Sequence, residues 1–205
     1  MAGPHLVSRK TSAAERGAWI CFADEAGQGM RAPRARTWGR RGRTPMIRYR
    51  GGKGRVNIAG LCCYRPGHRP RLIYRLLIFR DRKGEPKGFH HDHFQDLLKV
   101  AHRQLGAPIE LIWDNLSAHK TALDARFLKA HSDWLRVHYL PVGAPELNPT
   151  ENVWSTLKTG PLANLAPTSL DHLASVIKTG LKKLQYRPDL LRAFLAGTGL
   201  ALDDP

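Results

Sequence analysis

Cysteine, acidic residues and long apolar runs are all scarce in this chain of 205 residues. The three cysteines, Cys21, Cys62 and Cys63, form neither a C-x-x-C pair nor a zinc-ligand spacing, so the sequence predicts buried, reduced thiols and excludes a disulfide scaffold. No segment approaches the roughly 18 uncharged apolar residues of a membrane-spanning helix, and we therefore expect no membrane partner. Neither an internal repeat nor a low-complexity segment is present.

The shortage of acids leaves the chain strongly basic. Thirty-three Lys and Arg residues against 17 Asp and Glu residues give a formal net charge of +16. Such a surface predicts a polyanionic partner. Hydrophobic residues make up 42% and charged residues 24% of the chain, which excludes a disordered or collagenous protein. The length suits one domain, which we place at residues 18–205 behind a loose lead-in at residues 1–17.

Hydrophobic periodicity predicts a mixed α/β sheet with helices on its faces. The apolar runs that predict strands lie at 19–24, 56–64, 71–79, 109–114 and 135–140. The second and third of these runs have the spacing of an antiparallel hairpin. Helical spacing is found at 92–105, 120–131, 149–158, 170–184 and 188–196.

Two aspartates close apolar runs, Asp24 in FADEAG and Asp114 in IWDN. Each aspartate alone has a simpler interpretation, an Asx-type turn at the end of a strand. In open α/β sheets, however, functional sites gather beyond the carboxyl ends of the strands. Two strands that deliver the same arrangement therefore make both aspartates candidate catalytic residues.

A third carboxylate, Glu151, lies in PELNPTENVWSTLK. Asn148 is a suitable helix cap, Pro149 suits the first helical position, and N-x-x-E is close to a capping box. Glu151 can therefore cap the helix or point into a cleft, and the spacing leaves both open. Three carboxylates in a basic protein suit metal-assisted phosphodiester chemistry, in which two Mg²⁺ ions share oxygen ligands.

A basic segment at residues 31–55 contains ten Lys or Arg residues and no acid. Two aromatic residues, Trp38 and Tyr49, are interleaved with these charges. Such a segment is typical of DNA binding through phosphates, with little sequence information. Its candidate DNA contacts are Arg36, Trp38, Arg40, Arg41, Arg43, Arg48, Arg50 and Lys53.

Three blocks, FADEAGQGM…RTWGRRGRTP, LIWDNLSAHK and LPVGAPELNPTENVWSTLK, occur in the order found in a known enzyme family. They resemble the catalytic domain of bacterial insertion-sequence transposases of the mariner superfamily, over about residues 19–196. The resemblance implies a ribonuclease-H-like fold and a DDE triad of Asp24, Asp114 and Glu151, which would be both catalytic and metal-binding. The 36 residues between Asp114 and Glu151 are close to the mid-thirties spacing of that family. Within or beside these blocks, His119, Lys120 and Lys158 are further candidate DNA contacts.

The resemblance also implies how such a domain works. It implies two Mg²⁺ ions, with Mn²⁺ as a substitute, and cut-and-paste transposition into a TA dinucleotide. The implied partners are double-stranded DNA at transposon ends and target, a second copy of the chain, and a helix-turn-helix module from a partner reading frame. We expect a cytoplasmic, nucleoid-associated bacterial protein. Two alternatives stay open: a related nuclease that cleaves without joining, and a non-catalytic DNA-binding remnant.

Overall fold

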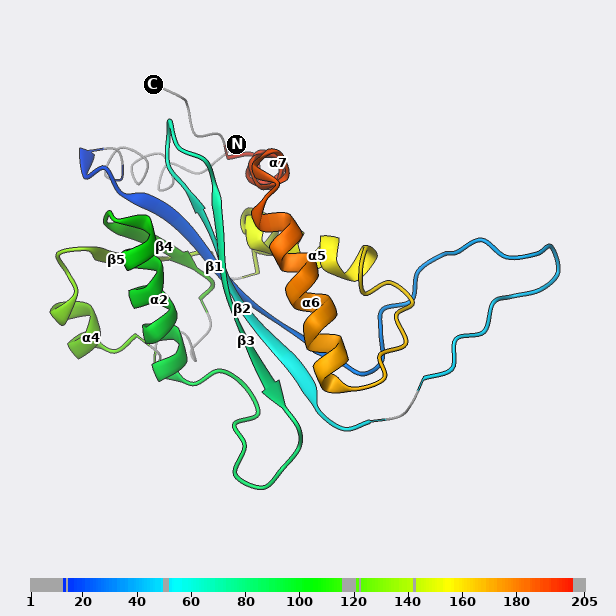
Figure 1. Ribbon diagram of the computed structural model, residues 1–205. Helices are drawn as coiled ribbons and strands as arrows, with labels where there is room; N and C mark the ends of the chain where they lie inside the picture. Colours follow the sequence, from blue (N-terminus) through cyan, green and yellow to red (C-terminus); the bar gives the residue numbers. More distant parts are fainter. Residues whose placement is uncertain are drawn as a thin grey trace.

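A five-stranded mixed sheet forms the centre of the molecule (Figure 1). The computed structural model describes residues 13, 15–49, 52–115, 121, 123–141 and 143–200. The strands are β1 (Trp19–Gly29), β2 (Arg55–Tyr64), β3 (Arg71–Phe79), β4 (Ile109–Trp113) and β5 (Leu135–Tyr139), in the spatial order β3-β2-β1-β4-β5. Neighbours β1, β2 and β3 are antiparallel, whereas β4 runs parallel to both β1 and β5. The predicted mixed sheet and the predicted hairpin are confirmed.

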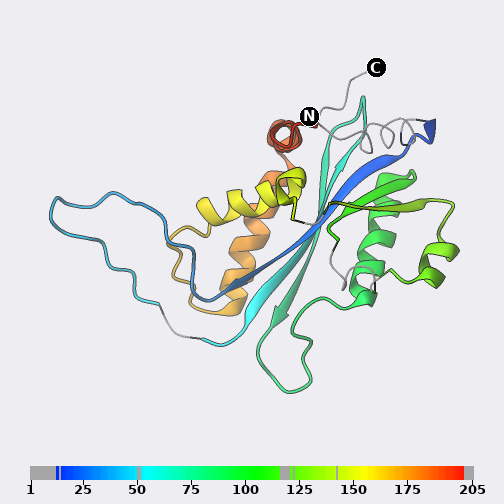
Figure 2. The same ribbon diagram turned by 180° about the vertical axis from the view of Figure 1, so that it is seen from behind.

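Helices cover both faces of this sheet (Figures 1 and 2). One face carries α2 (His91–Leu105) and α4 (Ala125–Ala130). The other carries α5 (Pro149–Thr159), α6 (Leu170–Gln185) and α7 (Pro188–Gly197), and the 3₁₀ turn η1 (Pro145–Leu147) leads into α5. Helix α4 is shorter than the predicted 120–131 because Asp124 caps it: its side chain accepts a hydrogen bond from the Phe127 N–H.

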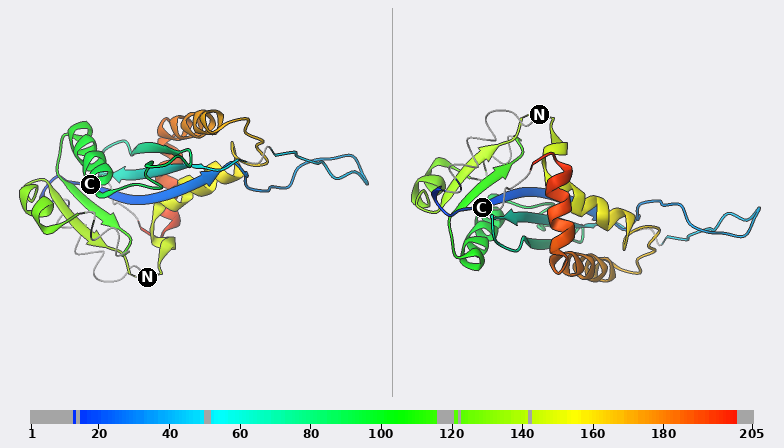
Figure 3. Two further views of the ribbon diagram at one scale, coloured as in Figure 1. Left: turned by 90° about the horizontal axis from the view of Figure 1, so that it is seen from below. Right: turned by 90° about the horizontal axis from the view of Figure 1, so that it is seen from above.

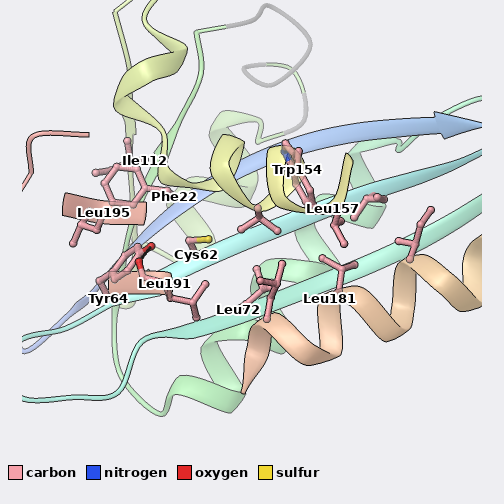
Figure 4. Close-up of a cluster of buried hydrophobic side chains, with 14 of the residues drawn as sticks. Phe22, Cys62, Tyr64, Leu72, Ile112, Trp154, Leu157, Leu181, Leu191 and Leu195 are labelled. Atoms are coloured by element: carbon pink, nitrogen blue, oxygen red, sulfur yellow. Dashed lines mark hydrogen bonds between the residues drawn. The ribbon is translucent and has the colours of Figure 1, made fainter. Parts of the chain in front are cut away.

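Two buried clusters, one on each face, hold the layers together. The α5–α7 face buries Phe22, Cys62 and Ile112 of the sheet against Trp154, Leu157, Leu181 and Leu191 of the helices (Figure 4). The alternating side chains of the same strands, such as Cys21 and Leu111, meet α2 on the other face. This alternation is the period of two expected for strands buried on both sides. All three cysteines are buried and free, as predicted.

Strand β1 does not end at Asp24, so the predicted strand range of 19–24 is wrong at its end. Pairing with β2 continues to Gly29, which lies opposite Arg55. Pairing with β4 stops much earlier, at Phe22 opposite Ile112. Asp24 therefore lies in the interior of a strand, where β1 is paired on one side only.

The basic segment forms a long arm that projects from one end of the sheet (Figures 1 and 3). We call residues 33–49 the basic arm. Every residue from 34 to 48 is exposed, and the Trp38 side chain is 100% exposed. A turn at its tip is closed by a hydrogen bond from the Arg43 N–H to the Arg40 carbonyl.

In the segment that precedes β1, the Arg16 side chain donates to the Glu110 carboxylate at 2.7 Å. The His138 ring contacts the other Glu110 oxygen at 2.6 Å, so this buried carboxylate links the segment before β1 to β4 and β5. The domain boundary near residue 18 stays a prediction. Within the described residues, no helix is long and apolar enough to cross a membrane.

Candidate active site

The register of two parallel strands brings Asp24 and Asp114 together. The last paired residues of β1 and β4 are Phe22 and Ile112. Asp24 and Asp114 each lie two residues further along their own chain, so they leave the paired region at the same level. Both line one cavity of about 220 Å³. Asp114 directly follows the end of β4, whereas Asp24 lies within β1, two residues beyond the last residue that pairs with β4. The structure thus brings the two predicted carboxylates to one cavity.

Helix α5 places Glu151 beside the two aspartates. Two side chains at its start bind consecutive carbonyls of β1: Thr150 Oγ1 donates to Phe22 O at 2.8 Å, and Asn148 Nδ2 donates to Ala23 O at 3.0 Å. Both side chains belong to buried residues. These bonds fix the first turn of α5 against β1, and Glu151 in that turn lines the same cavity.

The cap of α5 is Asn148, without help from Glu151. Asn148 Oδ1 accepts from the Thr150 N–H, and the Asn148 N–H donates to Pro145 O. In a capping box, Glu151 would accept from that same N–H. The Asn148 N–H is already bonded to Pro145 O of the 3₁₀ turn, so it does not need Glu151 as an acceptor. The exposed Glu151 carboxylate instead lines the cavity.

The Trp154 side chain forms a hydrogen bond with the Asp24 carboxylate. Its indole Nε1 donates to Asp24 Oδ2 at 2.8 Å, while the ring is buried between α5 and the sheet (Figure 4). Gly60 is the β2 partner of Asp24, and a Cβ at Gly60 would lie 2.8 Å from Trp154 Cη2. The missing side chain therefore makes room for the ring that orients the carboxylate.

The electrostatics of the cavity favour a cation. Burial raises the pKa of Asp24 to about 7, and the Glu151 carboxylate raises it in the same direction. Hydrogen bonds from the Glu25 N–H and the Trp154 indole act in the opposite sense, and Asp114 adds a smaller increase. A positive charge in the cavity would relieve this crowding of carboxylates.

The oxygen donors around the cavity suit a hard cation such as Mg²⁺. Besides the three carboxylates, Asn115 and Asn148 line it. Asn115 Oδ1 is buried and has no hydrogen-bond partner among the residues that the structure describes. Within the same residues, no group of three Asp, Glu, His or Cys side chains lies close enough to enclose a single ion. The carboxylates therefore share a cavity without converging on one point.

The candidate DNA contacts fall into two groups. Arg36, Trp38, Arg40, Arg41, Arg43 and Arg48 are exposed on the basic arm, and Lys53 follows it, with Nζ 3.8 Å from Asp81. Lys158 is exposed on α5, on the helix that carries Glu151. Arg50, His119 and Lys120 lie outside the described residues. The DNA contacts stay predictions.

A comparison with protein families shows the family of this chain. The family model described as DDE superfamily endonuclease matches residues 19–174, which include all three carboxylates. The chain belongs to the DDE superfamily endonucleases. A comparison with curated protein sequences finds no match.

Solved structures show the fold of this DDE-family domain. A crystal structure of the Mos1 strand transfer complex matches with a TM-score of 0.53 and 19% identity, over 97% of this chain and 60% of that chain. The Mos1 mariner paired-end complex with Mn matches with a TM-score of 0.55 and 17% identity, over 97% and 61%. The isolated Mos1 catalytic domain matches with a TM-score of 0.51 and 16% identity, over 97% and 91%. The DDE-family domain thus has the ribonuclease-H-like fold and spans about 60% of the longer Mos1 chains.

The sequence alone does not predict the residues that support the three candidate carboxylates. Helical spacing predicts only a buried side chain for Trp154, and it gives Thr150 no role. The one available signal for the contact with Asp24 is Gly60, because an isolated glycine inside a strand indicates close approach of another group.

Proposed function

We propose that this DDE-family domain is the catalytic domain of a transposase, which cleaves DNA and joins the freed end to target DNA. The observation that carries the proposal is the arrangement of Asp24, Asp114 and Glu151. Two come from adjacent parallel strands at the same level, the third comes from the first turn of α5, and all three line one cavity.

Asp24, Asp114 and Glu151 would hold two Mg²⁺ ions, with Mn²⁺ as a substitute. When bound, such ions lower the pKa of a water molecule and stabilise the departing oxygen of a phosphodiester. The residues present fit this cofactor because the donors are oxygens, and because burial and the Glu151 carboxylate raise the pKa of Asp24, so that a bound cation would relieve an unfavourable crowding of charge.

Around the triad, other side chains keep the carboxylates in place. Trp154 donates to Asp24 Oδ2 and so fixes the orientation of this carboxylate beside the cavity. Asn148 and Thr150 hold the first turn of α5, and therefore Glu151, at a fixed height beside β1. We propose that the basic arm and Lys158 bind the phosphates of the duplex on either side of the cleaved bond, since arginine and lysine are suited to that contact.

The wider biological setting is also part of the proposal. The Mos1 structures named above are a strand transfer complex and a paired-end complex, and we propose that this domain acts as a homodimer on two transposon ends. We further propose insertion at a TA dinucleotide and a cytoplasmic, nucleoid-associated location. The basic charge and the family membership support these points.

The proposal is tested by removing one carboxylate charge at a time. Asp114→Asn and Glu151→Gln keep the size of the side chains but remove the charge that Mg²⁺ requires. Nicking of plasmid DNA in Mg²⁺ or Mn²⁺, and strand transfer of pre-cut ends, should both fall to background. Mn²⁺ binding, followed by titration calorimetry, should weaken at least tenfold in each variant.

Glu146→Gln is the matched control, because Glu146 is an exposed acid five residues before Glu151 that does not line the cavity. It should cleave, join and bind Mn²⁺ like the wild type. A wild-type protein that nicks DNA but never joins ends would identify a nuclease instead. Wild-type DNA binding without cleavage in either metal would identify a non-catalytic remnant.

A further inference from the structure

The basic arm is anchored at its outgoing end by one side chain from a distant part of the chain. The turn between α5 and α6 brings Asn164 beside residues 33–35, where the arm leaves the body of the domain. Beyond this point, residues 36–48 are exposed and extend away from the sheet (Figure 1). The direction in which the basic arm leaves the domain is therefore set near Asn164.

Asn164 makes three hydrogen bonds to the backbone of the arm. Its N–H donates to Pro33 O at 3.0 Å. Its side-chain Oδ1 accepts from the Ala35 N–H at 3.0 Å, and its Nδ2 donates to the Ala35 carbonyl at 2.9 Å. A primary amide that pairs in both directions with one residue imitates the ladder of a β-sheet, and only Asn or Gln supplies it.

The backbone of Asn164 is adapted to this contact. Its φ of +55° lies in the left-handed region, which Asn tolerates better than most residues. The turn that carries it is also fixed to the catalytic helix, because Leu162 is buried and its N–H donates to Leu157 O of α5. The Asn164 turn is thus fixed to α5, the helix that carries Glu151 in its first turn.

The end of the segment that returns from the arm is held by packing. Gly54 has a φ of +98°, and a Cβ there would lie 2.5 Å from Phe79 O and 2.8 Å from Leu170 Cδ1. Leu170 is the first residue of α6, so both ends of the basic segment touch the connection between α5 and α6 or the helix that follows. The packing at Gly54 sets where the segment rejoins β2, whereas the Asn164 bonds set the direction in which the arm leaves.

We infer that Asn164 is a positioning residue, which aligns the basic arm with the catalytic carboxylates through α5. Glu151 and Thr159 are eight residues apart, so α5 separates the cavity from the Asn164 turn by about 12 Å along its axis. Successive phosphates of one DNA strand are about 3.4 Å apart along the axis. A loosened arm still binds phosphates, but it no longer presents one particular phosphodiester to the cavity. The inference rests on the proposed function, since it concerns how a bound duplex is aligned for cleavage.

The test variant is Asn164→Gly. Glycine adopts a positive φ without strain, so the variant keeps the turn and removes only the two side-chain bonds to Ala35. Thr168→Ala is the matched control: Thr168 is exposed in the same α5–α6 connection, and its hydroxyl contacts the His172 ring. Melting temperature confirms that both variants are folded.

Two measurements are made on each protein. In the absence of DNA, hydrogen exchange of the Ala35 amide should be at least tenfold faster in Asn164→Gly than in the wild type or in Thr168→Ala. With a 30-base-pair duplex, Asn164→Gly should keep the wild-type salt dependence of binding and a Kd within threefold. Its single-turnover nicking rate at saturating DNA should fall at least tenfold, whereas a role in stability alone would leave that rate unchanged.

Unchanged exchange at Ala35 would overturn the inference, because the Asn164 bonds would then not hold the arm. Faster exchange with an unchanged nicking rate at saturating DNA would overturn it too, since alignment would not depend on these bonds. A wild-type protein that fails to bind or nick DNA would instead contradict the proposed function, and the exchange measurement on free protein separates that failure from the first.

Discussion

At the scale of single residues, the candidate site balances burial against charge on Asp24. This side chain is partly buried near the Glu151 carboxylate, and its pKa is raised to about 7. Trp154 partly compensates by donating to Oδ2. The site therefore stores an unfavourable interaction that a bound cation would remove, which is common where a protein is organised for a ligand rather than for stability.

Asp24→Asn should stabilise the metal-free protein in a pH-dependent way. Between the pKa of about 3.9 for an unfolded Asp and about 7 in the folded protein, the folded chain binds more protons, so wild-type stability falls as pH rises through this window. Each unit of pKa shift corresponds to about 1.4 kcal/mol. Asn still accepts from the Trp154 indole. Melting in EDTA should show the variant gaining on the wild type from pH 4 to pH 8.

Two comparisons make the outcome specific. Asp133→Asn, at an exposed aspartate, should show no such trend. Mg²⁺ at pH 8 should stabilise the wild type and leave Asp24→Asn unchanged. A constant difference between variant and wild type across the pH range would mean that the Asp24 pKa is not raised.

At the scale of elements, α5 assembles the site. One helix supplies Glu151, orients Asp24 through Trp154, and continues into the turn that holds the basic arm. Two side chains at its start, Asn148 and Thr150, fix it to β1 by hydrogen bonds to consecutive carbonyls. A change there should affect stability and catalysis together.

Asn148→Ala should be more costly than the removal of an ordinary cap. It removes the acceptor for the Thr150 N–H, and it also leaves the Ala23 carbonyl without its buried donor. The expected decrease in the free energy of unfolding is about 1 to 3 kcal/mol in urea. Ser169→Ala is the control, because Ser169 caps α6 through the His172 N–H at an exposed position and should cost about 1 kcal/mol or less. Equal decreases in the two variants would show that the bond to β1 contributes nothing.

Local sequence signals predict the elements of α5 and of the hairpin well because caps, prolines and periodicity act within a few residues. The Asn148 cap, the helix predicted at 149–158 and the β2–β3 hairpin are all found in the structure. The contact of Trp154 with Asp24 is beyond such signals, because it depends on how α5 docks across two strands and on the space above Gly60.

The predicted extent of β1 is wrong for a related reason. Asp24, Gly27 and Gly29 indicate a turn when only local preference is considered. In the folded protein, β2 pairs with this stretch as far as Gly29, and a partner strand distant in the sequence overrides local preference. The sequence predicts that the three carboxylates belong together because of their order and spacing, and the structure places them at one cavity. Their supporting contacts depend on packing, which local sequence does not show.

At the scale of the whole molecule, the exposed positive charge of the basic arm is separated from the candidate catalytic carboxylates. The carboxylates lie in a cavity between the sheet and α5, while the largest run of unopposed positive charge lies on an arm that contributes little to the core. Changing the arm should therefore alter DNA affinity without altering the fold.

Replacing Arg40, Arg41 and Arg43 with Ala tests this separation. All three side chains are exposed near the tip of the arm, so melting temperature should stay within about 2 °C of the wild type, as expected for exposed positions. Binding to any duplex should weaken, and the magnitude of the slope of log K against log salt should decrease by about 0.9 for each phosphate that the variant no longer neutralises.

The control replaces Lys178, Lys182 and Lys183 on the exposed side of α6 with Ala, which lowers the net charge from +16 to +13, as the arm variant does. If both variants show the same decrease in affinity and in slope, net charge alone attracts DNA and the arm has no special part. A decrease confined to the arm variant would place the duplex along the arm, on the side of the domain where α5 and Asn164 tie that arm to Glu151.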